Sequence, residues 1–164
     1  MQISKAKIEQ LSEILCIYED ARRFMKENGN PNQWGANNPP SEKTIDDIER
    51  GKLYVVTEDD AILAVFFFDL SDDPTYKFIY EGKWLNDKSY GVIHRIAVSS
   101  KARGKGIAKL CFDYAFSFCN NLRIDTHINN IPMQKALSKS GFIKCGIIHL
   151  PDGGERIAFQ KTEV

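Results

Sequence analysis

The amino-acid sequence predicts an α/β (α+β) fold, in which helices flank a β-sheet. Two strand-like segments, residues 53–58 and 61–70, are separated only by a short turn, which is the pattern of a β-hairpin. Residues 90–98 form another strand-like segment, which leads through a glycine-containing turn into an amphipathic helix at residues 104–119. No internal repeat and no low-complexity linker interrupts this order, so we expect one domain over residues 1–164.

The N-terminal region predicts two helices joined by a long loop. Residues 5–27 carry apolar side chains at helical spacing, with Ser4 as the N-cap and Gly29 beyond the end. Residues 28–43 are rich in Gly, Asn and Pro, which is typical of a loop. A variant of the capping box at residues 44–47 predicts the start of a short second helix.

The remaining segments differ in how clearly their structure can be predicted. Residues 64–68 are apolar without alternation, which indicates a strand covered on both faces. Residues 71–89 mix polar and aromatic side chains and give no assignment. After the helix at 104–119, we expect a short strand, a short helix and two further strands, at residues 122–127, 132–140, 142–150 and 156–161.

The composition is that of an ordinary soluble globular protein. Hydrophobic residues make up 43% of the sequence and charged residues 27%, a balance that argues against a disordered chain. Lys and Arg total 22, and Asp and Glu also total 22, so no overall charge draws the chain to nucleic acid or to an anionic membrane. No apolar run has the length of a membrane span and no signal-peptide core is present, so we expect the cytoplasm.

The cysteines give no sign of a metal site. Cys16, Cys111, Cys119 and Cys145 form no CxxC pair, and no histidine lies at zinc-ligand spacing from them. A free cysteine usually behaves as a small apolar side chain. We therefore expect buried thiols and no bound metal.

The turn at residues 101–106, with the sequence KARGKG, carries the clearest functional pattern because it places two glycines among three cations. Amide N–H groups at the start of a helix are unpaired and lie at the positive end of the helix dipole. Glycine lets a phosphate approach them, since no Cβ intervenes. The turn therefore predicts a phosphate or pyrophosphate site. The alternative, that the glycines serve only a tight turn, is left open by spacing alone.

The turn does not match the two most familiar phosphate loops. A Walker loop needs Ser or Thr at this point, but Gly106 is followed by Ile107, and the dinucleotide fingerprint needs Gly where the chain has Lys109. Residues 101–106 instead resemble the pyrophosphate loop of the GNAT superfamily of acyl-CoA-dependent N-acetyltransferases. That loop is commonly written Gln/Arg-x-x-Gly-x-Gly/Ala, and here Lys101 replaces the usual Gln or Arg.

The resemblance extends over residues 52–160. The segments IAV before the turn and IAKL after it are similar to the family's, at residues 96–98 and 107–110. So is the later stretch in which Asn130 starts a short helix that ends in Lys-x-Gly-Phe, at residues 139–142. The order of the elements from the first helix onward also agrees with the family.

The resemblance implies a GNAT-type fold, with a central mixed, mostly antiparallel sheet, a splayed parallel strand pair and flanking helices. Acetyl-CoA is the implied co-substrate: its pantetheine arm would lie between the splayed strands, and its pyrophosphate on the amides that follow the first of them. The implied cofactor-binding residues are Ile96, Ala97, Val98, Lys101, Arg103, Gly104, Lys105, Gly106, Ile107, Ala108, Lys109, Asn130 and Met133.

The acceptor chemistry calls for a general base, because an amine must be neutral to attack. A lysine-like amine with a pKa of about 10.4 is only about one part in 10³ neutral at pH 7. His94 lies on the strand beside the expected thioester, and Asp125 and His127 are two residues apart on the next strand. We therefore predict His94, or the pair Asp125 and His127, as the catalytic group. The alternatives are structural roles, such as an ion pair of Asp125 with Arg95 or Arg123, or acceptor recognition by the pair.

Two aromatic loops are the predicted acceptor-binding walls. Trp34 lies in the first loop, and Tyr76 and Trp84 lie in the second, where each ring could stack on a substrate or cover a cationic amine. The alternative is that these rings only pack the loops against the molecule.

Leu137 marks a departure from the family pattern. Many family members have a tyrosine acid on the helix after the asparagine, and alignment on Asn130 and the Gly-Phe pair at 141–142 puts Leu137 there. The sequence predicts an N-acetyltransferase that moves an acetyl group directly from acetyl-CoA to a primary amine of a small molecule or peptide. The alternative is a non-catalytic acyl-CoA-binding module of the same fold, which Leu137 favours. Zero net charge argues against a nucleic-acid acceptor, and we expect a monomer or a homodimer.

Overall fold

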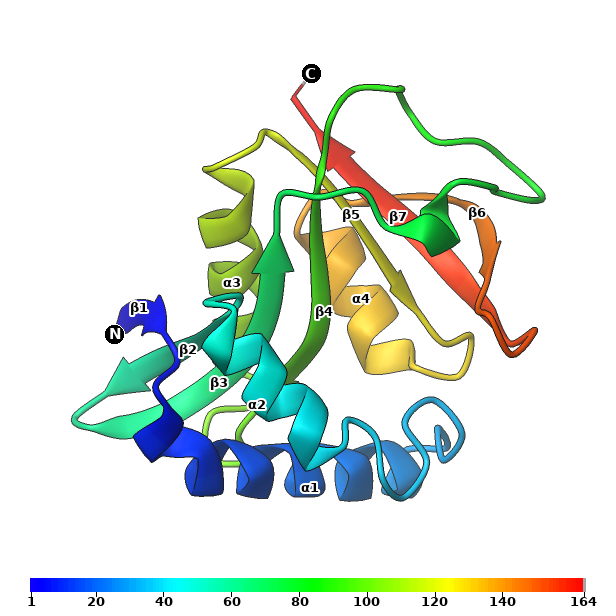
Figure 1. Cartoon of the computed structure of the whole chain (residues 1–164). Coiled ribbons are helices and arrows are strands. Elements are labelled where there is room, and N and C mark those ends of the chain that lie inside the picture. Colours follow the sequence, from blue (N-terminus) through cyan, green and yellow to red (C-terminus); the bar gives the residue numbers. More distant parts are fainter. Residues whose placement is uncertain (164) are drawn as a thin grey trace.

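One seven-stranded sheet forms the centre of the molecule, with two helices on each face (Figure 1). The structure is a computed structural model and describes residues 1–163. The strand order is β1-β2-β3-β4-β5-β7-β6, and every neighbouring pair is antiparallel except β4 and β5. The elements are β1 (Gln2–Lys5), α1 (Leu11–Glu27), α2 (Ser41–Glu49), β2 (Leu53–Glu58), β3 (Ala61–Asp69), β4 (Gly91–Val98), α3 (Ile107–Phe116), β5 (Asn121–Thr126), α4 (Ile131–Lys139), β6 (Ile143–His149) and β7 (Glu155–Thr162), with 3₁₀ turns at Ile8–Gln10 and Pro74–Tyr76.

The two faces of the sheet bury separate apolar clusters. Ala64, Phe66 and Phe68 of β3 pack on the side of α3 and α4, whereas Val65 and Phe67 pack on the side of α1 and α2. The prediction that this strand is covered on both faces is therefore confirmed, and the unbroken apolar run follows from it. The mixed, mostly antiparallel sheet with flanking helices is also confirmed.

The parallel pair β4 and β5 is joined at one end only. Gly91 pairs with Leu122 and Val92 with Arg123, and beyond these two pairs the strands diverge. At the junction a Cβ on Gly91 would lie 2.9 Å from the Phe68 ring and 3.0 Å from the Cys119 sulfur, so only glycine fits there. The divergence opens the middle of the sheet toward the carboxyl ends of both strands.

The segment between β3 and β4 crosses the molecule to the far edge of the sheet. Tyr80 and Ile147 of β6 exchange two backbone hydrogen bonds of 2.8 Å, and the amide of Lys83 donates to the carbonyl of Cys145. A Cβ on Gly82 would lie 1.9 Å from that same Cys145 carbonyl oxygen, so the contact requires glycine. The segment, green in Figure 1, therefore links the two halves of the sheet across the opening.

Several element boundaries differ from the sequence predictions. Ser4 is not a helix cap: it lies in β1, where it pairs with Val55 of β2, and the helix proper begins at Leu11. The helix α2 begins at Ser41 rather than at Thr44, whose hydroxyl instead donates to the carbonyl of Pro40. Short edge strands and the first turns of helices show little hydrophobic periodicity, so their boundaries are hard to predict from the sequence.

Two further predictions are only partly confirmed: the length of the helix that follows the glycine turn, and the burial of the cysteines. α3 spans Ile107–Phe116, shorter than the predicted 104–119. Cys111 and Cys145 are buried as expected, but Cys16 is exposed and Cys119 is half-buried. Among residues 1–163, no helix combines the length and apolar character that crossing a membrane requires.

Candidate functional site

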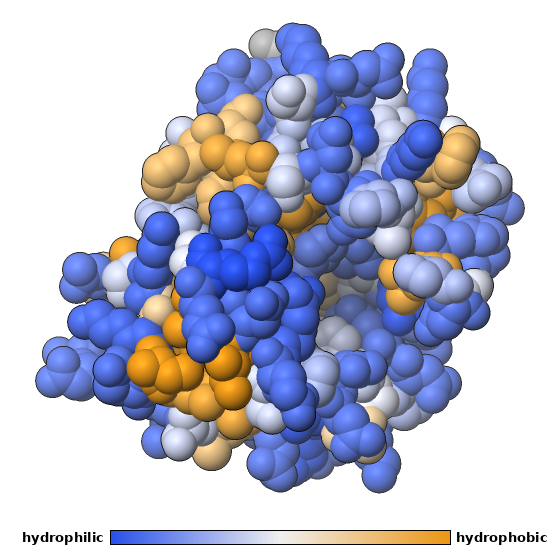
Figure 2. Space-filling model, in the orientation of Figure 1, coloured by the Kyte–Doolittle hydropathy of each residue, from blue (hydrophilic) through white to orange (hydrophobic). Residues whose placement is uncertain are grey.

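A cavity of about 440 Å³ lies where β4 and β5 diverge. Figure 2 shows the surface hollowed near its centre, in the region where Figure 1 shows the two strands separating. The walls come from β4, β5, the start of α4, the start of β7, the loop between α1 and α2, and the segment between β3 and β4. Of the predicted site residues, those that line it are Trp34, His94, Ile96, Asp125, Asn130 and Met133.

His94 is held by a carboxylate that the sequence analysis did not single out. Its Nε2 lies 2.7 Å from Oδ2 of Asp73, which also lines the cavity. The other oxygen of Asp73 accepts hydrogen bonds from the amide and the hydroxyl of Thr75, at 2.8 and 2.7 Å. Asp73 is thereby fixed at the start of the 3₁₀ turn Pro74–Tyr76, as the side-chain cap of that turn.

Asp73 is an ionised partner for the imidazole. Burial alone would raise the pKa of Asp73, but the hydrogen bonds from His94 and Thr75, together with the His94 charge, lower it to about 2. Because the carboxylate only accepts hydrogen bonds, Nε2 carries the proton that the two groups share, and Nδ1 is the basic nitrogen of the ring. The sequence signal that could have found Asp73 is the Asp-Pro-Thr pattern of a capped turn.

Asp125 is held on the opposite strand by a buried tyrosine. The hydroxyl of Tyr76 donates to Oδ2 of Asp125 at 2.6 Å, and the indole N–H of Trp84 donates to the carbonyl of Tyr76 at 2.9 Å. Burial raises the pKa of Asp125, despite the opposing charges of His94 and Arg156 and the Tyr76 hydrogen bond. Tyr76 is 1% exposed, and neither it nor Trp84 lines the cavity. The predicted stacking of these two rings on a substrate is not supported by their placement.

His127 does not share a strand face with Asp125. β5 ends at Thr126, and His127 lies in the turn before α4, where its Nδ1 accepts from the amide of Asn129 at 3.0 Å. Burial and the Arg156 charge lower the pKa of His127. The structure therefore brings His94 and Asp125 together at the cavity and leaves His127 outside its lining.

A bulge in β4 carries the residue next to His94. Arg95 has a φ of 49°, and the pairing with β3 shifts between Val65 and Phe67. The Arg95 Nε donates to Oδ2 of the fully buried Asp47 at 2.9 Å, and the Tyr18 hydroxyl donates to the Arg95 carbonyl at 3.0 Å. These two bonds fix the bulge from the side of α1 and α2.

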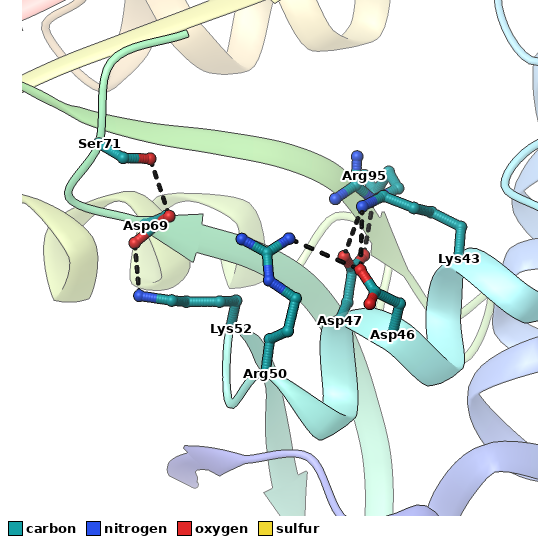
Figure 3. Close-up of polar contacts among 8 residues, drawn as sticks. All are labelled: Lys43, Asp46, Asp47, Arg50, Lys52, Asp69, Ser71 and Arg95. Atoms are coloured by element: carbon teal, nitrogen blue, oxygen red, sulfur yellow. Dashed lines mark hydrogen bonds and ion pairs between the residues drawn. The ribbon is translucent and has the colours of Figure 1, made fainter.

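Asp47 also binds a second cation (Figure 3). The Lys43 Nζ lies 3.1 Å from its Oδ1, so one buried carboxylate binds both Lys43 and Arg95. Arg123, on β5, stacks between Trp84 and Tyr90. The predicted alternative of an ion pair between Asp125 and either arginine is therefore wrong.

The glycine turn forms an open cradle of amides. Gly104 and Gly106 have φ values of 78° and 75°, a conformation that side chains other than glycine's rarely adopt, and a Cβ on either would meet nothing within 4 Å. Within residues 1–163, the amide N–H groups of residues 103–109 have no hydrogen-bond acceptor. Unpaired donors around open space at the start of α3 fit a phosphate.

The side chains around the turn divide into tethered and exposed cations. The Arg103 guanidinium lies 3.2 Å from Asp20 and 4.1 Å from the centre of the Phe24 ring, which ties the turn to α1. The Lys109 ammonium pairs with Asp113. Lys101 and Lys105 are exposed.

Asn130 caps α4 and connects it to the loop between α1 and α2. Its Oδ1 accepts from the amide of Met133 at 3.1 Å, and its Nδ2 donates to Oε1 of Gln33 at 2.8 Å. Trp34, beside Gln33, packs edge-on against Tyr18 with the ring centres 5.6 Å apart. Both polar atoms of Asn130 are thus bonded within the protein, so a cofactor contact would replace or share one of these bonds.

Leu137 lies in the core. It is fully buried in the cluster between the sheet and the helices α3 and α4, and no part of it lines the cavity. Leu137 therefore contributes to packing, and its apolar side chain cannot act as the acid.

Comparison with known proteins identifies the family. Residues 14–142 match the model of the acetyltransferase (GNAT) family. A crystal structure of a GNAT-family acetyltransferase from Streptococcus agalactiae is 33% identical, with a TM-score of 0.91, and the match covers 99% of this chain and 95% of that one. A search of curated proteins finds no match.

More distant structures share the fold. A GNAT-family acetyltransferase from Listeria monocytogenes is 20% identical with a TM-score of 0.72, covering 98% of this chain and 93% of that one. A chain of the NatC complex, whose structure is bound to Gag peptide and CoA, is 15% identical with a TM-score of 0.64, and the match covers both chains fully, at 100% each. The family model spans most of the sequence, and the streptococcal structure superposes on nearly all of it. The chain therefore belongs to the GNAT family of acetyltransferases.

Proposed function

We propose that this acetyltransferase moves an acetyl group from acetyl-CoA to a primary amine by direct transfer within a ternary complex. The observation that carries the proposal is the His94–Asp73 pair, which lies in the cavity between the diverging strands. The glycine turn with its unpaired amides begins three residues after β4 ends, so one strand connects the base to the anion cradle.

The proposed cofactor contacts follow from these positions. The amides of residues 103–109 would hold the pyrophosphate, and the backbone of Ile96, Ala97 and Val98 would contact the pantetheine arm along the open edge of β4. Asn130 and Met133 would flank the arm from α4. Acetyl-CoA, when bound, supplies the acetyl group as a thioester. The CoA in the NatC structure supports this choice of cofactor.

His94 would prepare the amine. Its Nδ1 accepts a proton from the acceptor's ammonium, and the Asp73 carboxylate stabilises the imidazolium that results. The neutral nitrogen then bonds to the acetyl carbon as the carbon–sulfur bond breaks. One proton leaves the amine nitrogen in the transfer, and the departing thiolate takes up one proton.

Protonation of the thiolate does not require a dedicated acid. A thiol pKa of about 8.5 lies close to neutral pH, so solvent or the acceptor's own proton suffices. The amine's pKa lies further from neutral pH, which makes deprotonation the larger demand. A buried leucine at position 137 is compatible with a mechanism in which the protein supplies a base for the amine and no acid for the thiolate.

A two-stage assay tests the proposal. CoA should raise the melting temperature, by the equivalent of about 2.7 kcal/mol at a hundredfold excess over its dissociation constant, whereas NAD should not. Thiol release should then be measured with acetyl-CoA over a panel of amines. No melting shift at millimolar CoA would overturn the cofactor assignment.

A variant of His94 tests its role. His94→Ala should lower kcat/KM by about 10² to 10⁴, with CoA affinity near that of the wild type. The loss should shrink as the pH approaches the amine's pKa of about 10, where free amine forms without help. Wild-type rates from pH 6 to 10 would remove His94 from the mechanism and leave Asp125 as the candidate.

The second candidate function is a non-catalytic acyl-CoA-binding module, and the buried Leu137 is the observation that favours it. CoA binding without thiol release on any amine would decide for this candidate. We also propose that the chain acts as one domain in the cytoplasm, which the unpaired cysteines among residues 1–163 support, since a reducing compartment keeps thiols free.

A further inference from the structure

Arg156 is a cavity-lining cation without a carboxylate partner among residues 1–163. It lies on β7, and its guanidinium donates to two backbone carbonyls, those of Glu155 at 2.9 Å and Gln33 at 3.3 Å. A guanidinium has five N–H donors, so three remain for a ligand.

Within residues 1–163, the other arginine and the lysine of the cavity already have carboxylate partners, unlike Arg156. Arg95 and Lys43 both bind Asp47. Arg156 is half-buried. Burial raises the pKa of Asp125 and the Arg156 charge opposes that rise, whereas burial and the Arg156 charge both lower the pKa of His127. A half-buried guanidinium that lines a cavity is suited to bidentate binding of a carboxylate.

The position of Arg156 assigns it to the acceptor rather than to the cofactor phosphates. β7 pairs with β5 on the side away from β4, whereas the glycine turn follows β4. The cavity therefore has an anionic group, Asp73 with His94, on the β4 side and a cationic group on the β7 side.

We infer that the acceptor is a small amino acid-type molecule, with a carboxylate that binds Arg156 and an amine that reaches His94. The inference rests on the proposed function, since it names the acceptor of that same site. A cavity of about 440 Å³ has the size of a small-molecule site, and part of it must take the acyl end of the cofactor. The ammonium is attracted by the ionised Asp73 before it is deprotonated.

Matched amine triplets test the inference. The probes are phenylalanine, phenylalaninamide and phenethylamine, together with lysine, lysinamide and cadaverine, assayed by thiol release and by mass of the product. With the wild type, the carboxylate-bearing member of a reactive triplet should have a kcat/KM about 10- to 100-fold above the others, the effect of one charge-assisted contact.

Arg156→Gln should remove this preference. It should raise the KM for the carboxylate-bearing probe by about the same factor, whereas the carboxylate-free amines and the CoA affinity should change far less. Arg156→Lys should restore part of the preference, because it keeps the charge but loses the fork geometry. Arg50→Gln is the matched control: this arginine is outside the cavity lining and, among residues 1–163, pairs only with the exposed Asp46.

The outcomes separate the two proposals. If carboxylate-free amines react as well as their carboxylate-bearing partners, or if Arg156→Gln slows all of them equally, the acceptor inference is wrong and the proposed function stands. If acetyl-CoA binds but no amine of either kind is acetylated, both are overturned.

Discussion

The Asp73 carboxylate fixes both the orientation and the tautomer of the His94 ring. Two hydrogen bonds from Thr75 hold one oxygen, and the imidazole Nε2 meets the other at 2.7 Å. An amide in place of the carboxylate would keep the shape but offer no negative charge to an imidazolium. The residue acts through His94, so we regard it as a positioning residue.

Asp73→Asn should therefore lower kcat/KM by about 10²-fold, near the lower end of the loss expected for a general base. CoA affinity should stay near the wild-type value, and the loss should shrink toward high pH. Asp72→Asn, an exposed neighbour, should change neither quantity. Rates between pH 6 and 10 for both variants check this, and equal rates for Asp73→Asn and wild type would contradict it.

Asp125 should make stability depend on pH in the opposite sense to a salt-bridged carboxylate. Burial raises its folded pKa above the usual value for aspartate, about 3.9, so folding disfavours its ionised form. Its contribution to the free energy of unfolding is then greatest below the unfolded pKa, and is lost as the pH rises through the raised folded pKa.

Asp125→Asn should consequently be more stable than the wild type at pH 7.5, with the advantage gone below about pH 3, where Asp is protonated in both states. The amide oxygen of Asn can still accept the Tyr76 hydroxyl, whereas Asp125→Ala leaves that buried hydroxyl without an acceptor. Urea unfolding of both variants at the two pH values measures this. An Asn variant that is less stable than the wild type at pH 7.5 would show that the ionised carboxylate is stabilising.

At the scale of the elements, a substitution in the turn before α3 should affect CoA binding much more than it affects folding. Gly106→Val should abolish CoA binding, because the side chain would fill the space in front of the unpaired amides. It also carries backbone strain of about 1–2 kcal/mol, since φ is 75°.

Gly153→Val in the turn between β6 and β7 is the matched control for that strain. Gly153 has a φ of 86° and also meets nothing within 4 Å, but it lies outside the proposed cofactor site. Both variants should lose similar stability, measured by circular dichroism on heating, and only the first should lose CoA binding. Normal CoA binding by a folded Gly106→Val protein would exclude the turn as the pyrophosphate site.

Helix α2 stabilises the β4 bulge through Asp47. Asp47→Ala would leave Arg95 without its carboxylate and Lys43 with only the exposed Asp46, at a cost of about 3 kcal/mol in the free energy of unfolding. Asp46→Ala, one residue earlier and exposed, should cost less than about 0.5 kcal/mol. Chemical denaturation of the two variants checks the difference, and similar small losses would mean that the bulge is held without Asp47.

Most elements, but not the site's polar contacts, could be predicted from the sequence. The hairpin at Asp59 and Asp60 and the doubly buried β3 follow from local pattern, which depends only on neighbouring residues. The partner of His94 could not be found in this way, since Asp73 is 21 residues away and meets it only through the path of an irregular segment. The sequence left two roles open for Tyr76 for the same reason, stacking on a substrate or packing its loop, and the fold buries the ring against Trp84.

At the scale of the whole molecule, the proposed chemistry depends on the width of the cavity between the two halves of the sheet. One half consists of β1 to β4 with α1 and α2, and it carries His94, which binds Asp73. The other half consists of β5 to β7 with α4, and it carries Asp125 and Arg156. Gln33 connects the halves on one side through Asn130 and Arg156, and the segment containing Tyr80 connects them on the other. Cavity width is thus set by long connections as well as by the sheet.

The two-pair junction between β4 and β5 also governs the order in which the chain folds. The hairpins β2–β3 and β6–β7 close short turns and can form early, because contacts near in sequence cost little loop entropy. Pairing Val92 with Arg123 must instead close a long loop for two residue pairs. We expect the two halves to form first and to join late, so that the cleft forms last. A ligand bound in the cleft should then stabilise the folded protein without being needed for either half to fold.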